Sequence, residues 1–212
     1  MKQALLALLL LATAGCSSAY YAAMEKVGFE KRDILESRVE DARDAQLKSQ
    51  QEFKDALTQL SQMIGFHGGD LQAKYEALSA QYDESKAAAD EVSARINKVE
   101  TVAFDLFAEW EDELKQYQNA QLRADSRQKL IATKRQFDAL VRTMRKAERK
   151  MPPVLRALHD NVLYLKHNLN AKAIGALTGE FNGLQSDINN LVRDMDQAIA
   201  ESNQFIQSIK QN

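Results

Sequence analysis

Apolar residues recur along this chain at alternating steps of three and four positions, in three long runs. A repeat of this kind keeps one side of a helix facing a partner helix, and over many turns it produces a left-handed coiled coil. The three runs therefore predict three long helical seams. The first seam contains Leu35, Val39, Ala42, Gln46, Ser49, Phe53, Ala56, Leu60 and Met63. The second contains Leu71, Tyr75, Leu78, Tyr82, Ser85, Ala89, Val92, Ile96, Val99, Ala103, Leu106 and Trp110. The third contains Ile174, Leu177, Phe181, Leu184, Ile188, Leu191, Met195, Ala198, Ser202, Phe205 and Ile209.

Three short segments interrupt the seams. Residues 65–70 contain three glycines, and the tandem prolines after Met151 lack the amide hydrogen that a continuing helix needs. Asn168 and Asn170 coincide with a change of phase in the apolar pattern, and either residue can cap a helix end. These breaks predict helices over about residues 24–64, 70–150, 153–168 and 171–210.

The predicted fold class is all-α, an elongated antiparallel coiled-coil bundle of three to four long helices. At about 1.5 Å per residue, a helix over residues 24–64 spans about 60 Å and one over residues 70–150 spans about 120 Å. The first helix then covers only half of the second. We therefore expect a bundle that is three-stranded where the first helix is present and thinner towards Met151. Residues 65–69 and 151–153 are predicted to mark opposite ends of the long helix, the latter as a hairpin tip.

Two further features bear on the packing of the predicted helices. The apolar stripe slips between Trp110 and Leu114, which leaves open whether the long helix continues through that point. Residues 123–156 contain eleven basic and three acidic side chains, whereas residues 175–201 contain five acidic and one basic. Because complementary fields favour one register, the basic half of the long helix is predicted to lie beside the acidic last helix.

The first eighteen residues have the pattern of a secretion signal. Lys2 precedes a short apolar stretch, which ends in the small residues Ala14 and Gly15 and then in Cys16, the only cysteine of the chain. This ending resembles the lipobox of bacterial lipoproteins, in which the cysteine thiol is acylated, although Thr13 stands where leucine is commonest. The alternative is an ordinary signal peptide that happens to precede a cysteine.

Lipidation of Cys16 divides the chain into three parts. Residues 1–15 are predicted to be a cleaved signal peptide, residues 16–23 a lipidated tether and residues 24–212 the helical bundle. Ser17 follows the cysteine, and by resemblance to enterobacterial sorting this favours the inner leaflet of the outer membrane, facing the periplasm. Several acyl chains (palmitate among them) would anchor the protein stably, because a single chain holds only marginally.

No grouping of residues with catalytic chemistry is found in the sequence. Of the three histidines, His67 lies in the glycine-rich turn, and His159 and His167 are two helical turns apart. The sequence therefore predicts no enzyme activity, no metal site and no cofactor. A net charge of −2 argues against a nucleic-acid partner. Trp110 lies among acidic residues, either as a seam residue or as a recognition point for a basic partner.

The basic residues of the segment 134–150 have two interpretations. They pair with the acidic last helix, or they contact an anionic lipid, a glycan or a protein. The members of this run are Lys134, Arg135, Arg142, Arg145, Lys146, Arg149 and Lys150.

One further segment, residues 161–171 with the sequence NVLYLKHNLNA, is distinctive and non-repetitive. Together with the lipobox and the segment RKMPPVL, it resembles an uncharacterised family of predicted proteobacterial lipoproteins, a domain of unknown function. The resemblance implies a helical coiled-coil structure and a location in the cell envelope. It brings no activity and no site residue.

The sequence thus favours a membrane-anchored, non-enzymatic lipoprotein that acts as a structural or interaction module of the envelope. Its lipid would fix one end, and its stiff helices would present a surface to an envelope protein or to a second copy in a homodimer. The alternative is a ligand- or ion-binding bundle. Its pocket would lie near the helix break at residues 159–170, with His159 or His167 in the lining.

Overall fold

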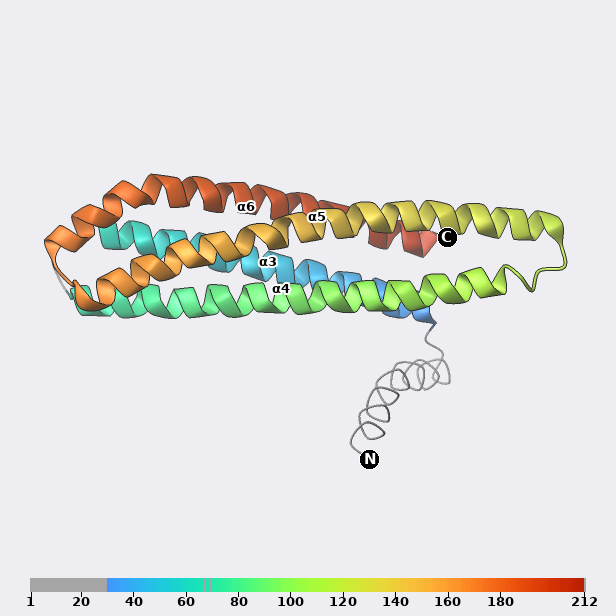
Figure 1. Ribbon diagram of the computed structural model, residues 1–212, viewed down its shortest axis with the longest axis horizontal. Coiled ribbons are helices and arrows are strands. Elements are labelled where there is room, and N and C mark those ends of the chain that lie inside the picture. Colours follow the sequence, from blue (N-terminus) through green and yellow to red (C-terminus); the bar gives the residue numbers. More distant parts are fainter. Residues whose placement is uncertain (1–29, 67, 69, 212) are drawn as a thin grey trace, which may run out of the picture.

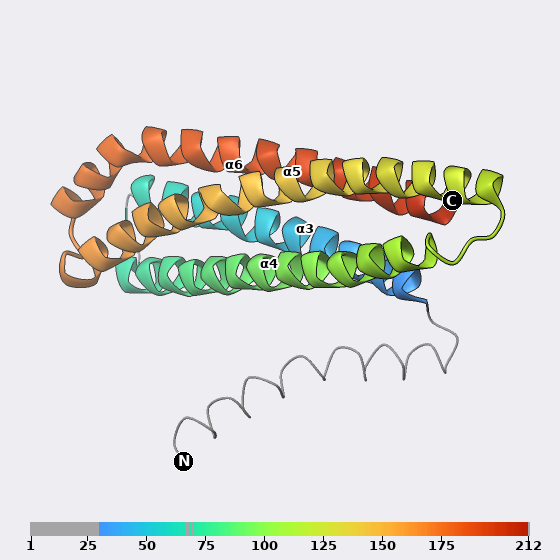
Figure 2. The same ribbon diagram turned by 45° about the vertical axis from the view of Figure 1, so that its right-hand side comes forward.

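A computed structural model describes residues 30–66, 68 and 70–211. Over those residues the chain forms four helices, α3 (Lys31–Ile64), α4 (Leu71–Glu113), α5 (Ala120–His167) and α6 (Ala171–Gln211), and no strand. Consecutive helices run antiparallel, and α6 returns to pack on α3, so that the four enclose one elongated core (Figure 1 and Figure 2). The predicted all-α antiparallel bundle is confirmed.

The heptad seams supply the core. Every member of the first seam is buried in α3, including the polar residues Gln46 and Ser49. The third seam is buried along α6 except for Phe181, which packs on the core partly exposed. The core residues that the structure describes lie between Ile34 and Ile209. The predicted signal, tether and first turns of a helix over residues 24–30 lie outside the described residues, except for Glu30.

The predicted single helix over residues 70–150 is wrong. The chain leaves α4 at Glu113, passes through a turn at residues 114–116 and starts α5 after Asn119, whose side-chain oxygen accepts hydrogen bonds from the amides of Gln121 (2.9 Å) and Leu122 (3.1 Å). The slip of the apolar stripe marked this break. The predicted long helix is therefore two antiparallel helices, and the bundle is four helices thick beside α3, where a thickness of three helices was predicted.

The prediction of a hairpin tip at Met151–Pro153 is also wrong. Both prolines lie inside α5, which continues to His167. Pro152 and Pro153 are exposed, while Met151 and Val154 on either side are buried in the core. A proline costs a helix one hydrogen bond, but on the outer face the freed carbonyl oxygens reach water. Burial of the neighbouring apolar residues then outweighs the break that the prolines favour.

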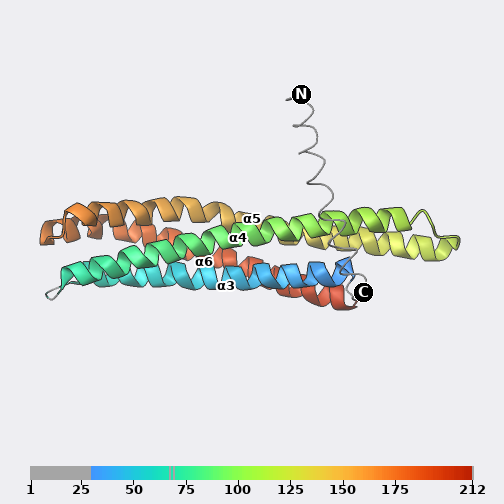
Figure 3. The same cartoon turned by 90° about the horizontal axis from the view of Figure 1, so that it is seen from below.

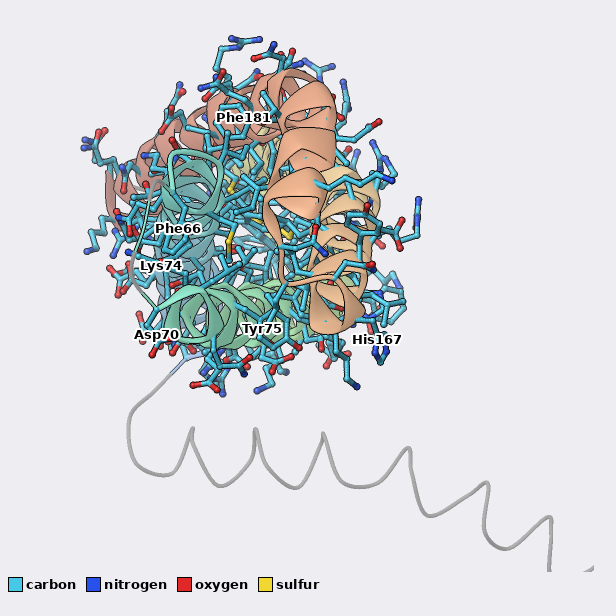
Figure 4. All side chains as sticks on the ribbon, turned by 90° about the vertical axis from the view of Figure 1, so that its left-hand side faces the viewer. Phe66, Asp70, Lys74, Tyr75, His167 and Phe181 are labelled. Carbon is cyan, nitrogen blue, oxygen red and sulfur yellow. The ribbon has the colours of Figure 1, made fainter. Side chains whose placement is uncertain are left out.

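The two other predicted breaks are confirmed. The chain turns between Ile64 and Leu71, and again between His167 and Ala171, at the same end of the bundle. Asn170 begins α6 as its N-cap, since its side-chain oxygen accepts a hydrogen bond from the amide of Ala173 (3.1 Å). Figure 4 shows this end, with charged groups directed outwards around an apolar centre.

At the opposite end, α4 and α5 extend past the start of α3 and the end of α6 (Figure 1 and Figure 3). The overhang follows from helix length, because α3 has 34 residues and α4 has 43. Lys31 at the start of α3 pairs with Glu109 of α4 at 2.8 Å, and Arg32 donates a hydrogen bond to the carbonyl oxygen of Ile209. The protruding segment, residues 110–130, is called the distal hairpin below.

Candidate functional site

The predicted lipidation residue, Cys16, lies outside the described residues, as does His67. The two remaining histidines are apart from each other. His159 packs against Tyr82 of α4, with ring centroids 5.2 Å apart, and His167 projects outwards at the end of α5 (Figure 4). Over the described part of the chain, no group of three histidine, cysteine or carboxylate residues is placed to hold a metal ion.

Trp110 is a seam residue. Its indole Nε1 donates a hydrogen bond to Ser126 Oγ at 2.8 Å, and so ties α4 to α5 at the base of the distal hairpin. The acidic residues around it have cationic partners within the bundle, since Glu109 pairs with Lys31 and Glu111 with Lys134. The structure therefore favours the seam interpretation of this tryptophan over a recognition point.

The basic run of α5 divides into two sets according to direction. The inward set pairs with neighbouring helices, as the charge pattern predicted: Lys146 and Lys150 contact Asp194 of α6 at 3.0 and 2.5 Å. Arg145 instead contacts Glu100 of α4, and this hydrogen bond raises the pKa of the guanidinium group. The basic residues of α5 thus link it to both of its neighbours.

Asp194 is the most buried carboxylate with an ion pair among the described residues, at 10% side-chain exposure. Burial alone would raise its pKa, but the hydrogen bonds and charges of Lys150 and Lys146 outweigh burial and hold the pKa below its ordinary value. A carboxylate with a depressed folded-state pKa contributes stability above its unfolded pKa of about 3.9, and that contribution is lost as the pH falls through the lower folded value.

We expect Asp194→Asn to lower the free energy of unfolding by about 1–2 kcal/mol at pH 7, because the two charged lysines lose their shared partner. The difference from the native chain should shrink as the pH falls below about 4. Urea unfolding at several pH values measures both effects. Asp187→Asn is the matched control, since Asp187 is exposed one heptad earlier on α6. An equal loss in the control would contradict the assignment.

The outward set of the basic run consists of arginines in an exact heptad. Arg135, Arg142 and Arg149 are exposed on α5, and Arg156 continues the series seven residues later. None of the four has an ion-pair partner among the residues that the structure describes. We call these four residues the arginine stripe. Arg156 lies outside the basic run of residues 134–150 that the sequence singled out, although its heptad spacing could have identified it.

A groove of about 570 Å³ lies between α5 and α6, close to the helix break. Asp160, Glu180 and Asp187 supply carboxylates to it, and Asn161 and Tyr164 supply an amide and a phenol. Of the residues predicted for a pocket here, Asn161 lines the groove, whereas His159 faces α4 and His167 faces solvent. The groove is open and acidic, so its chemistry would suit a cationic ligand.

A second groove, of about 610 Å³, lies on the distal hairpin. Half of its lining residues are cations, among them Lys115, Arg123 and Arg127, and Leu130 and Ile131 add apolar side chains. Tyr117 and Leu122 are exposed beside it. The described part of the chain therefore offers basic and apolar surfaces for contact, and one acidic groove.

No helix among the described residues has the length and apolarity to cross a bilayer. No curated protein matches the chain. One family profile, described as a protein of unknown function (DUF2959), matches residues 20–209, which is nearly the whole of the bundle. The chain therefore belongs to the DUF2959 family of proteins of unknown function.

Proposed function

We propose that this protein is a lipid-anchored, non-enzymatic interaction module of the cell envelope. The observation that carries the proposal is the N-terminal pattern, in which a basic start, a short apolar stretch and Ala14-Gly15 lead into the sole cysteine, Cys16. Acylation of Cys16 would attach the bundle to a membrane that none of its described helices can cross. Ser17 favours the inner leaflet of the outer membrane, with the bundle in the periplasm.

The architecture suits a positional role. The proposed lipidated tether covers residues 16–23, and Glu30, the first described residue of the bundle, lies 14 positions after Cys16. Four helices packed on one continuous core form a stiff body, and the distal hairpin extends beyond it. Such a body would hold a contact surface for an envelope protein, or for a second copy, at a fixed distance from the lipid.

We expect Cys16→Ala to abolish lipidation and membrane retention. Cells expressing the native chain and the variant would be labelled with radioactive palmitate and separated into membrane and soluble fractions. Label on the native chain and its loss from the variant would support the proposal. Cys16→Ala removes no residue of the described bundle, so folding of the variant, followed by circular dichroism, serves as the internal control. A variant that keeps its label would overturn the anchor.

The acidic groove between α5 and α6 favours a second candidate, a bundle that binds a cationic ligand. Asp160, Glu180 and Asp187 line it beside the helix break, where the sequence predicted a pocket. Ligand binding to the folded state raises its stability by mass action. A melting temperature that does not change with added divalent cations or polyamines would remove this candidate.

A further inference from the structure

The arginine stripe is a row of charge on the outer face of α5. Its members recur every seven residues, which is about 10.5 Å along a helix axis, so that the row from Arg135 to Arg156 is about 30 Å long. All four side chains are exposed, and Lys146 and Lys150 flank the row with about half of their side-chain surface open to solvent. The acidic residues near the row on α5 are Asp138, Glu148 and Asp160, and Glu148 is paired with Arg145.

The surroundings of the stripe indicate a broad, flat partner. Between Arg135 and Arg156 the exposed apolar residues described on α5 are Pro152 and Pro153, and no large aliphatic or aromatic side chain is exposed there, so that face lacks the aromatic anchors typical of a protein interface. Exposed apolar residues instead lie just beyond both ends of the row, Ile131 at 45% and Leu163 at 49% exposure. Clustered Lys and Arg residues are attracted to the negative surface of a bilayer that contains anionic lipids, and the apolar residues at the two ends of the row would contact its headgroup region.

We propose that the arginine stripe docks the bundle onto an anionic lipid bilayer. One guanidinium group can donate two parallel hydrogen bonds to the oxygens of a phosphate. Each cation near an anionic bilayer also adds to the electrostatic attraction. The proposal rests on the proposed anchoring for its biological setting, because a lipid on Cys16 would hold the stripe close to headgroups. It then fixes the orientation of the protein: α5 faces the membrane, and α3, which packs on α4 and α6, faces away from it.

The stripe can be tested without the lipid anchor. The chain from Ser17 onwards, unacylated, contains the whole of the described core and is the protein to use. It would be sedimented with vesicles of phosphatidylcholine alone and with vesicles that also contain phosphatidylglycerol, at low and at high salt. We expect binding to the anionic vesicles only, weakened by salt because exposed charges are screened.

The decisive variant replaces Arg135, Arg142, Arg149 and Arg156 together by glutamine. At roughly fivefold per cation, we expect a loss of affinity on the order of a hundredfold or more. The matched control removes four exposed lysines of α3, α4 and α6, namely Lys48, Lys86, Lys98 and Lys172, and should lose much less. Circular dichroism checks folding; if the quadruple variant is unfolded, Arg142→Gln alone should lose about fivefold.

A third variant has all four arginines replaced by lysine. It distinguishes binding that needs only positive charge from binding at a site that needs the shape of the guanidinium group. A bilayer responds to the charge, so this variant should keep most of the binding. The proposal would be overturned if the arginine-to-glutamine variant and the control that removes Lys48, Lys86, Lys98 and Lys172 lost equal affinity. It would also be overturned if binding did not depend on phosphatidylglycerol. A dimer that dissociates on loss of the stripe, without vesicle binding, would assign the face to a second copy instead. Failure of palmitate labelling at Cys16 would leave these outcomes unchanged.

Discussion

Replacing Phe137 by alanine is expected to lower the free energy of unfolding by about 3–5 kcal/mol. Phe137 lies on α5 where three helices meet. Its ring contacts Phe107 of α4 edge-to-face, with centroids 5.5 Å apart, and Phe205 of α6 at 5.9 Å. All three rings are buried, so the substitution removes both aromatic contacts and leaves a cavity that the stiff helices cannot close.

The change would be measured by urea unfolding, followed by circular dichroism. Phe104→Ala is the matched control, because Phe104 lies on α4 near the same level but is 75% exposed. A surface substitution of this kind changes stability by less than about 0.5 kcal/mol. Similar losses in the two variants, or a loss below about 1 kcal/mol for Phe137→Ala, would contradict a core at this level of the bundle.

Replacing Gln46 by methionine is expected to have the opposite sign and to raise the free energy of unfolding by about 1–3 kcal/mol. Gln46 is fully buried in the seam of α3, and neither amide atom has a hydrogen-bond partner among the described residues. A buried polar group without a partner loses its hydration and gains nothing in return. Methionine has a similar length and shape, so it fills the same space without that cost.

The neighbouring glutamine provides a control of the opposite sign. Gln50 lies one turn further along α3, and its Nε2 donates to the carbonyl oxygen of Val192 (3.2 Å) and to Asp196 Oδ1 (2.7 Å). Gln50→Met removes these bonds and should lower the free energy of unfolding by about 1–2 kcal/mol. If both substitutions shifted stability in the same direction, hydrogen bonding would not explain the difference between the two sites.

The seams show what the sequence could predict. A heptad repeat states directly which side of a helix is buried, and even its polar members, Gln46 and Ser202, proved to be buried where the repeat put them. The two glycine- and asparagine-containing breaks were predictable for the same reason, because those residues act on the local backbone. The fold class therefore followed from periodicity and turn residues.

The two errors have one physical cause. Residues 114–119 contain neither glycine nor proline, so the turn there depends on packing of the antiparallel partner and on the cap at Asn119. Pro152 and Pro153 favour a break, yet tertiary burial of their neighbours keeps α5 continuous. Local propensity was outweighed by packing in both places, and sequence periodicity alone does not measure packing.

The candidate surface needed the structure for a different reason. Arg135 and Arg145 look alike in the sequence, and only the positions of α4 and α6 show that one is exposed and the other paired. The heptad spacing of the arginines was visible in the sequence, but the outward direction of the row was not. Charge patterns therefore predicted which helices attract each other, and the structure shows which basic residues of α5 are paired and which are exposed.

The meeting of Lys31 with Glu109 near the base of the distal hairpin has a mechanical consequence. A partner that gripped the distal hairpin while the tether held the start of α3 would pull on neighbouring points at one end of the bundle. Such a load peels α3 from α4 turn by turn, starting at this ion pair, and needs little force. A load applied at residues 168–170, at the far end, would instead act parallel to the helix axes and shear α3 along its packed length, which meets greater resistance.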